Sequence, residues 1–485
     1  MYLKQLAFYT LQLKYLGIKN NSTEDIILNT LSGLMSNLET GNKQFYNTLI
    51  NLKTIIIESI DIYHRTCYER DIKPKEIETN LKLNRKLDIT ELIRLGEKEF
   101  SKKLKSISEE KRTIFEILFL VLKSICINLV ELKSFNLSDN CVYSEILYLL
   151  NTLNFPEVSN KLLIKKINFG VKINSNLTKK LYQIRKENYG EQTEATVSYS
   201  TYPSKAILVA GTNLQELKKV LDAVKDLDID VYTHGDMIIA YTYPFFRKYK
   251  NLKGQFGKGI DSCLLDFATF PGSILIAKHS LENIEYLYRG RLFTTDNFVP
   301  QGVVQICNDD YSQLISSALS AKGFKTGKER EKINIGCSEE CLKSELDKII
   351  DNLQNYKKII IFTTKEYSNE QREFFKKLTK RIKPDEFLIS LAEEYNIKNC
   401  INIKSAPDFY MVYRIMEYLL PHLKKYNINL SVYISKCDKH TISNVIRLKQ
   451  IGADNIYLSK CAPIMLNPSL TNSLKNLYGI LPANL

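Results

Sequence analysis

Hydrophobic residues recur at helical spacing through about the first 185 residues of the chain. The clearest stretches are Leu3–Leu16, Ile26–Leu38, Phe45–Ile62, Ile114–Leu132 and Tyr143–Leu153. Two polar segments, Ser22–Asp25 and Ser106–Glu109, are typical of helix starts, the second with the S-x-x-E spacing of a capping box. Glycine and proline are scarce here, so the pattern predicts a helical bundle.

The pattern changes after Gly190, where short β-branched runs begin to alternate with amphipathic helices. We expect strands at 206–209, 231–233, 273–276, 359–362, 387–391, 430–434 and 456–458, and helices at 214–224 and from Leu342, Glu370, Tyr410 and Ile442. Such alternation favours parallel, doubly wound sheets. The predicted fold class is therefore multidomain α + α/β, with a helical bundle followed by two Rossmann-like α/β domains with mainly parallel sheets.

The expected boundaries follow from these changes of pattern. We predict a helical bundle domain at residues 1–190, a first Rossmann-like domain at 191–328 and a second at 329–485. The segment 321–332, rich in Gly, Lys and Glu, is interpreted as the linker between the two α/β domains. Ligands of open α/β sheets lie beyond the carboxyl ends of the strands, which directs attention to residues such as His234.

Several short sequence motifs around His234, called blocks below, follow one another in a fixed order. Together they are a more specific signal than any one of them alone. They are Ala206–Gly211, Thr233–Met237 with Tyr243–Pro244, Leu252–Gly257, Asp266–Phe267 with Phe270–Gly272, Arg291–Thr295 and Pro300–Val303. These blocks resemble those of the hybrid cluster proteins, also called prismane or hydroxylamine reductase proteins. The resemblance extends more weakly over nearly the whole chain. It implies the reduction of hydroxylamine or nitric oxide at a hybrid iron–sulfur–oxygen cluster, with a second, cubane cluster bound near the N-terminus.

The cluster ligands of the family are mostly replaced in this chain. Carried over by position, His234 is identical, while the two Glu ligands become Asp266 and Asp438. The four cysteine positions hold Ser280, Lys365, Glu393 and Ala406. No cysteine precedes Cys67, so the cubane ligands are missing and we expect the chain to start inside the first helix. Because iron–sulfur clusters need thiolates, we expect neither cluster to be present.

One imidazole and three carboxylates remain at these positions: His234, Asp266, Glu393 and Asp438. Such a donor set suits a single Fe, Mn or Zn ion, which leaves a metal site in the former cluster pocket open as an alternative. Cys263 and Cys437, beside Asp266 and Asp438, are interpreted as small hydrophobic residues.

Composition indicates the partners and the cellular compartment. The net charge is +14, with 68 Lys and Arg against 54 Asp and Glu. Because the lysines are spread along the whole chain, we predict that they lie on solvated helix faces and that the protein has no specific nucleic-acid partner. Ten irregularly spaced cysteines indicate a reducing compartment. No signal peptide is evident, and the apolar stretch 114–132 contains three charged residues, so we predict a buried helix, no membrane partner and a cytoplasmic protein.

These expectations give one leading function and two alternatives. The leading hypothesis is a pseudoenzyme of the hybrid-cluster fold with a binding or regulatory role, with homo-oligomers or association with an intact paralogue left open. One alternative is an oxidoreductase of the hydroxylamine reductase type. The other is a metalloenzyme that uses the His and carboxylate site.

Overall fold

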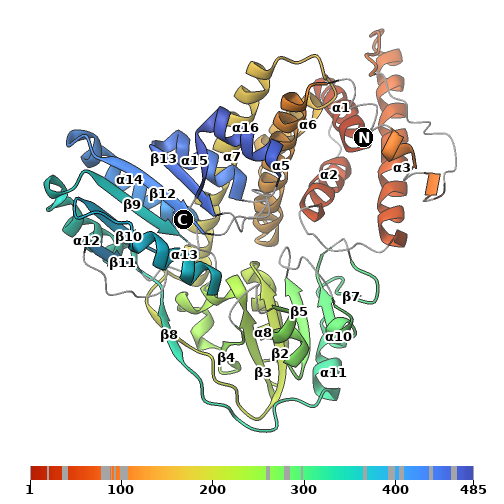
Figure 1. Cartoon of the computed structure of the whole chain (residues 1–485). Helices are drawn as coiled ribbons and strands as arrows, with labels where there is room; N and C mark the ends of the chain where they lie inside the picture. Colours follow the sequence, from red (N-terminus) through yellow and green to blue (C-terminus); the bar gives the residue numbers. More distant parts are fainter. Residues whose placement is uncertain are drawn as a thin grey trace. The chain divides into compact units, whose positions relative to one another are not determined.

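The computed structural model describes most of the chain in two compact units. The described residues are 2–18, 21–34, 42–77, 88, 90–91, 94–98, 107–257, 263–277, 285–296, 299–363, 369–391, 399–403, 409–435, 441–459 and 467–483. The first unit comprises Met1–Met35, Glu39–Leu177 and Asn297–Gln301. The second comprises Ser36–Leu38, Thr178–Asp296 and Gly302–Leu485. The prediction of a mixed fold with a helical part followed by α/β sheets is confirmed (Figure 1).

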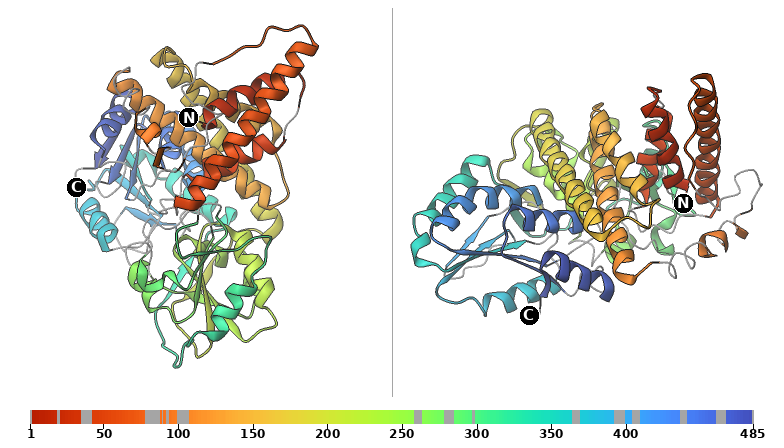
Figure 2. Two further views of the ribbon diagram at one scale, coloured as in Figure 1. Left: turned by 90° about the vertical axis from the view of Figure 1, so that its right-hand side faces the viewer. Right: turned by 90° about the horizontal axis from the view of Figure 1, so that it is seen from above.

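The first unit is helical. Its long helices run alongside one another (Figure 2) and are α1 (Tyr2–Tyr15), α2 (Asn21–Gly33), α3 (Asn42–Glu69), α5 (Glu109–Ser134), α6 (Asn140–Thr152) and the first part of α7 (Asn160–Tyr189). Ser108 caps α5 by accepting a hydrogen bond from the backbone amide of Lys111. The helix thus begins within the predicted start segment, while Ser106 of the expected capping box lies outside the described residues.

Helix α5 is the apolar stretch recognised in the sequence. Among the described residues it is the one helix long and apolar enough to cross a membrane, but 72% of its most apolar window is buried within the protein. Ile114, Leu118 and Ile125 are fully buried. Gly170 of α7 lies against Val121 and Leu149, where a side chain would overlap Val121. This packing is that of a core helix in a bundle, as predicted.

The first sheet of the second unit has six strands in the order β4-β3-β2-β5-β6-β7, all parallel. The strands are β2 (Lys205–Gly211), β3 (Ile229–His234), β4 (Leu252–Gln255), β5 (Ser273–Ala277), β6 (Leu292–Thr294) and β7 (Val304–Gln305). Helix α8 (Leu214–Val224) follows β2, with the bounds that the sequence predicted. Because β2 and β5 are central, nearly all their side chains are buried, as their continuous aliphatic sequences indicate.

The second sheet repeats this topology. Its order is β11-β10-β9-β12-β13-β14, again with parallel neighbours. The strands are β9 (Lys358–Thr363), β10 (Glu386–Ser390), β11 (Cys400–Asn402), β12 (Asn429–Ile434), β13 (Asn455–Ser459) and β14 (Ile480–Ala483). The helices are α12 (Glu339–Ile350), α13 (Asn369–Thr379), α14 (Phe409–Lys425), α15 (Thr441–Ile451) and α16 (Pro468–Tyr478). In both sheets the strand order reverses at a central pair, which is the arrangement of doubly wound folds.

The segment expected to be a linker is hydrogen-bonded to the first α/β domain. Phe324 and Lys328 form antiparallel bridges with Ser204 and Thr201. The strand β8 (Lys332–Ile335) then pairs with β1 (Ala195–Ser198). The interpretation of the segment as the linker between two α/β domains stays a prediction, but its polar composition did not reveal that several of its backbone groups are paired. The division at 190 and 328 into three domains stays a prediction.

Tyr232 of β3 offers a test of this core by pH. Its ring is fully buried, its oxygen accepts a hydrogen bond from the amide of Tyr202, and burial raises its pKa to about 12. Above pH 10 the unfolded chain releases this proton and the folded chain retains it, so the free energy of unfolding falls as pH rises toward 12. Tyr232→Phe has no proton to release, so we expect its free energy of unfolding to fall less steeply with pH. The difference in slope should be about 1.4 kcal/mol per pH unit above pH 10, and urea unfolding at about pH 9 and about pH 11 measures it.

Tyr286, which is 88% exposed in the same unit, supplies the control. Tyr286→Phe should leave the alkaline loss of stability unchanged. An equal effect of the two substitutions would show that burial of Tyr232 does not cause the alkaline loss of stability.

Candidate functional site

The candidate site is built on the end of β3. Val231, Tyr232 and Thr233 are buried in the sheet, and His234 is the last residue of the strand, 3% exposed. The chain then turns at Gly235, with φ of +60°, into the 3-10 helix η1 (Gly235–Thr242). A glycine at this place lets the backbone turn directly after the histidine without the strain that a side chain would bring. His234 is thereby held at the carboxyl end of a parallel strand, where such folds place their sites.

Asp266 is the partner of His234. It lies on the short helix α9 (Cys263–Thr269), and its Oδ2 is 3.1 Å from Nε2 of His234. The two side chains are 4% and 17% exposed, so the contact is largely shielded from water. Phe267 packs its ring edge-on against the imidazole, with 4.9 Å between ring centroids. The two family ligand positions that the structure describes are therefore brought together, and their side chains bond to each other.

Gln255 of β4 fixes the turn that follows His234. Its side-chain amide donates to the carbonyl of Gly235 over 3.1 Å, and its Oε1 accepts a hydrogen bond from the Thr233 hydroxyl. Two residues later, Gly257 has φ of +80° and lies against the Asp266 carboxylate, where any side chain would overlap it. The blocks around His234 contained both residues, but their supporting roles depend on contacts between separate strands and could not be found from spacing.

Cys263 shares α9 with Asp266 but belongs to the core. It is buried in an apolar cluster with Phe267, Phe270 and Tyr288. This supports the interpretation of Cys263 as a small hydrophobic residue.

The other predicted positions lie outside the described residues. These are Ser280, Lys365, Glu393, Ala406 and Asp438, together with Cys437. Among the residues that the structure does describe, no three His, Cys, Asp or Glu side chains are grouped as metal ligands would be. The set of His234, Asp266, Glu393 and Asp438 therefore stays a prediction.

The described cysteines are free thiols in unlike surroundings. Burial raises the pKa of Cys337 to about 12 and that of Cys400 to about 11, and it also raises the pKa of Cys126. These three thiols are protonated at neutral pH.

Comparison with known proteins decides the family. The model of the Prismane/CO dehydrogenase family matches residues 22–404. This chain belongs to the Prismane/CO dehydrogenase family. The resemblance to hybrid cluster proteins drawn from the blocks around His234 is thus confirmed at the level of the family.

Two relatives are named hydroxylamine reductase. The protein from Actinobacillus succinogenes is 26% identical over 362 residues, which cover 70% of this chain and 65% of the relative. That from Methanocella arvoryzae is 24% identical over 310 residues, covering 61% of this chain and 57% of the relative. The chain thus spans less than two thirds of the length of these relatives.

A solved structure with the same fold is that of the α subunits of acetyl-CoA synthase/carbon monoxide dehydrogenase, with NiZn[Fe4S4] and NiNi[Fe4S4] clusters. The TM-score is 0.51 at 9% identity, over 100% of this chain and 80% of that chain. At this identity the likeness concerns the fold alone.

The comparisons correct the expectation about cofactors. From the replaced cysteines we expected no iron–sulfur cluster, or at most a single Fe, Mn or Zn ion. That expectation is contradicted, because the chain belongs to the Prismane/CO dehydrogenase family and the structure that shares its fold holds [Fe4S4] clusters. The expectation rested on ligands that were carried over one by one from an approximate alignment with the family.

Proposed function

We propose that this chain is a pseudoenzyme of the Prismane/CO dehydrogenase family, which does not reduce hydroxylamine and has a binding or regulatory role instead. The observation that carries the proposal is the direct contact between His234 Nε2 and Asp266 Oδ2 at 3.1 Å. By the family resemblance both are ligand positions of the reactive centre. In this chain each side chain already has the other as its partner, in a setting largely closed to water.

The replacement of Glu by Asp at position 266 supports the same proposal. Asp is one methylene shorter than Glu, so its carboxylate stays close to its own helix. Gly257 gives the Asp266 carboxylate the space that it needs beside His234. The local backbone therefore accommodates the pair as a hydrogen-bonded unit, which is the arrangement of a satisfied, partly buried polar pair.

A second candidate is an oxidoreductase of the hydroxylamine reductase type. The observation in its favour is the name of the two relatives, which are 26% and 24% identical to this chain. In that reaction hydroxylamine takes up two electrons and two protons and yields ammonia and water. The candidate requires an external electron donor and a redox centre in the chain.

One assay separates the two candidates. The full chain is purified without oxygen after expression with added iron and cysteine, and hydroxylamine loss and ammonia formation are followed with reduced viologen as the electron donor. We expect no turnover above that of the His234→Ala variant. Iron and sulfide are measured in the same preparation, so that inactivity is distinguished from failed loading with the cofactor expected of the family.

The hydroxylamine reductase of Actinobacillus succinogenes, prepared in parallel, is the positive control. Turnover by this chain that is lost in His234→Ala would overturn the proposal and establish the second candidate. Inactivity of a preparation loaded with iron and sulfide would support the pseudoenzyme.

We also propose that the protein is cytoplasmic. Support comes from the cysteines of the described ranges, all of which are free thiols, as expected in a reducing compartment. Cell fractionation with an antibody against the chain tests this, and recovery outside the cytoplasm would contradict it.

A further inference from the structure

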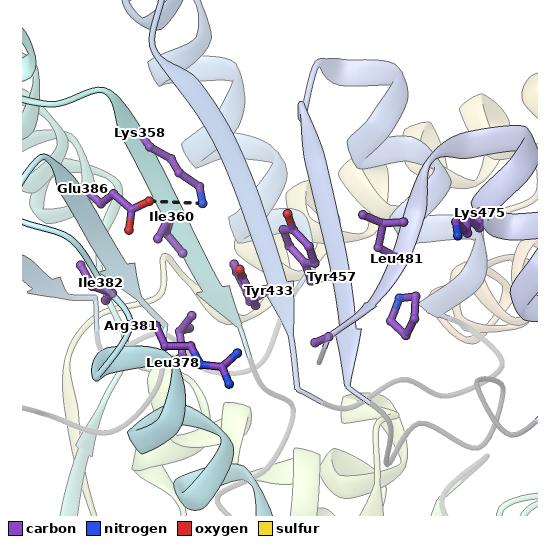
Figure 3. A pocket seen from close by; sticks show the side chains of 12 residues that line it. Lys358, Ile360, Leu378, Arg381, Ile382, Glu386, Tyr433, Tyr457, Lys475 and Leu481 are labelled. Atoms are coloured by element: carbon purple, nitrogen blue, oxygen red, sulfur yellow. Dashed lines mark ion pairs between the residues drawn. The ribbon is translucent and has the colours of Figure 1, made fainter. Parts of the chain in front are cut away.

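The second α/β sheet carries a cavity that is separate from the residues of the His234 site. Its volume is about 380 Å³, within the range of roughly 300–1,000 Å³ usual for small-molecule sites. Strands β9, β10, β12, β13 and β14 contribute to it, together with α13 and α16 (Figure 3). Ile360, Leu378 and Leu481 give it an apolar lining. Every lining residue belongs to the described part of the second unit.

Two tyrosines lie side by side in this cavity. Tyr433 of β12 and Tyr457 of β13 are cross-strand partners, with stacked rings whose centroids are 4.5 Å apart and whose planes differ by 18°. Figure 3 shows both hydroxyl oxygens at the same end of the two rings. Among the residues that the structure describes, neither hydroxyl has a hydrogen-bond partner. The sheet thus presents two neighbouring hydroxyl groups to a ligand.

The Tyr433 hydroxyl is a donor at neutral pH. Burial, and then the neighbouring Tyr457 and Glu386, raise its pKa to about 12, although Arg381 acts in the opposite direction. A protonated phenol donates a hydrogen bond to an anion, and hydrogen bonds to charged acceptors are the stronger class.

The charges of the cavity favour an anion. Lys358, Arg381 and Lys475 stand against one carboxylate, Glu386, which gives 3 − 1 = +2. Glu386 is engaged by Lys358, with 3.4 Å between Oε1 and Nζ. Arg381 follows α13 and Lys475 lies on α16, so the two exposed cations come from opposite sides of the cavity (Figure 3).

We propose that this cavity binds a small organic anion with an aromatic or apolar body. Its carboxylate or phosphate group would accept hydrogen bonds from the hydroxyls of Tyr433 and Tyr457. Arg381 and Lys475, on either side of the cavity, would add the positive charge that favours an anion. Its body would lie on Ile360, Leu378 and Leu481, removing apolar surface from water. This site goes beyond the proposed function, since it is built on a different sheet from the one that ends in His234.

Calorimetric titration of the full chain tests the chemistry of the ligand. The probes are phenyl phosphate, benzoate, benzyl alcohol and inorganic phosphate. We expect the two aromatic anions to bind, and both benzyl alcohol, without charge, and inorganic phosphate, without a ring, to bind roughly tenfold or more weakly. The ratio of phenyl phosphate to benzoate affinity identifies which anionic group fits better.

Substitutions then locate the site. Tyr433→Phe should weaken phenyl phosphate binding roughly three- to tenfold, because it removes one donor to the anion. Lys475→Gln should weaken it by a similar factor, because it removes one positive charge from the lining. Lys357→Gln is the matched control, since Lys357 is 85% exposed, pairs with Asp385 and does not line the cavity. Equal loss in Lys357→Gln, equal binding of benzyl alcohol, or no binding of either aromatic anion at millimolar concentration would overturn the proposal.

Discussion

Gly211→Ala should destabilise the second unit by about 3 kcal/mol or more, the largest effect that we expect from a single methyl group. Gly211 ends β2 at the central pair of the first sheet, with φ of +122°, a conformation that side chains rarely adopt. An added Cβ would also overlap the backbone carbonyl of Ala277 in β5. Backbone cannot move aside as a flexible side chain can, so strain and steric overlap add. Urea unfolding followed by circular dichroism measures the loss.

Gly290→Ala is the matched control for this experiment. Gly290 lies in the same unit, follows the helix α10 (Tyr286–Arg289), and has open space where a Cβ would stand. We expect its free energy of unfolding to change by no more than about 0.5 kcal/mol. Similar losses in the two variants would refute the claim that the close approach of β2 and β5 requires glycine.

The second large effect is expected from Gly257→Ala at the candidate site. Its φ of +80° and the overlap of an added Cβ with the Asp266 carboxylate both oppose the substitution. Because the carboxylate is the far end of a side chain, it can rotate away, and the 3.1 Å contact with His234 would then be lost. We expect a loss of about 1–3 kcal/mol from the backbone conformation, together with a changed Nε2 resonance of His234 in 15N-histidine-labelled protein.

Asp266→Asn separates the loss of stability caused by the backbone at position 257 from the change in the His234 resonance. It removes the charge of the acceptor and leaves the backbone at position 257 unchanged. If Gly257→Ala acts through Asp266, both variants should shift the His234 resonance, while only Gly257→Ala carries the cost of the left-handed backbone. An unshifted His234 resonance in Gly257→Ala would show that the pair tolerates the methyl group.

The central strands and their helices were predictable because burial on both faces leaves a local signature. The runs 206–209 and 359–362 are continuous apolar segments, and they lie within β2 and β9 at the centres of the two sheets. The strands β1, β4, β6, β7, β8, β11 and β14 were missed, and each of them is only two to four residues long. A short edge strand is defined by its neighbour's hydrogen bonds and has little pattern of its own.

The candidate site was likewise predictable from the sequence only in part. His234 and Asp266 were found from the order of blocks along the chain, and the structure places their side chains in contact. The roles of Gln255 and Gly257 were not predicted, because each acts on a residue of another element. The cofactor expectation was contradicted by the family to which the chain belongs and by the clusters of the structure that shares its fold.

By itself, the sequence determined the helical part, the two doubly wound sheets and the family, because these depend on periodicity and on blocks in a fixed order. Only the tertiary structure decided that His234 and Asp266 bond to each other, that the segment 321–332 is paired along the first domain, and that Tyr433 and Tyr457 share a cationic cavity. The physical reason is that hydrogen bonds, steric overlap and cavity charge are set by distances between residues that lie far apart in the chain.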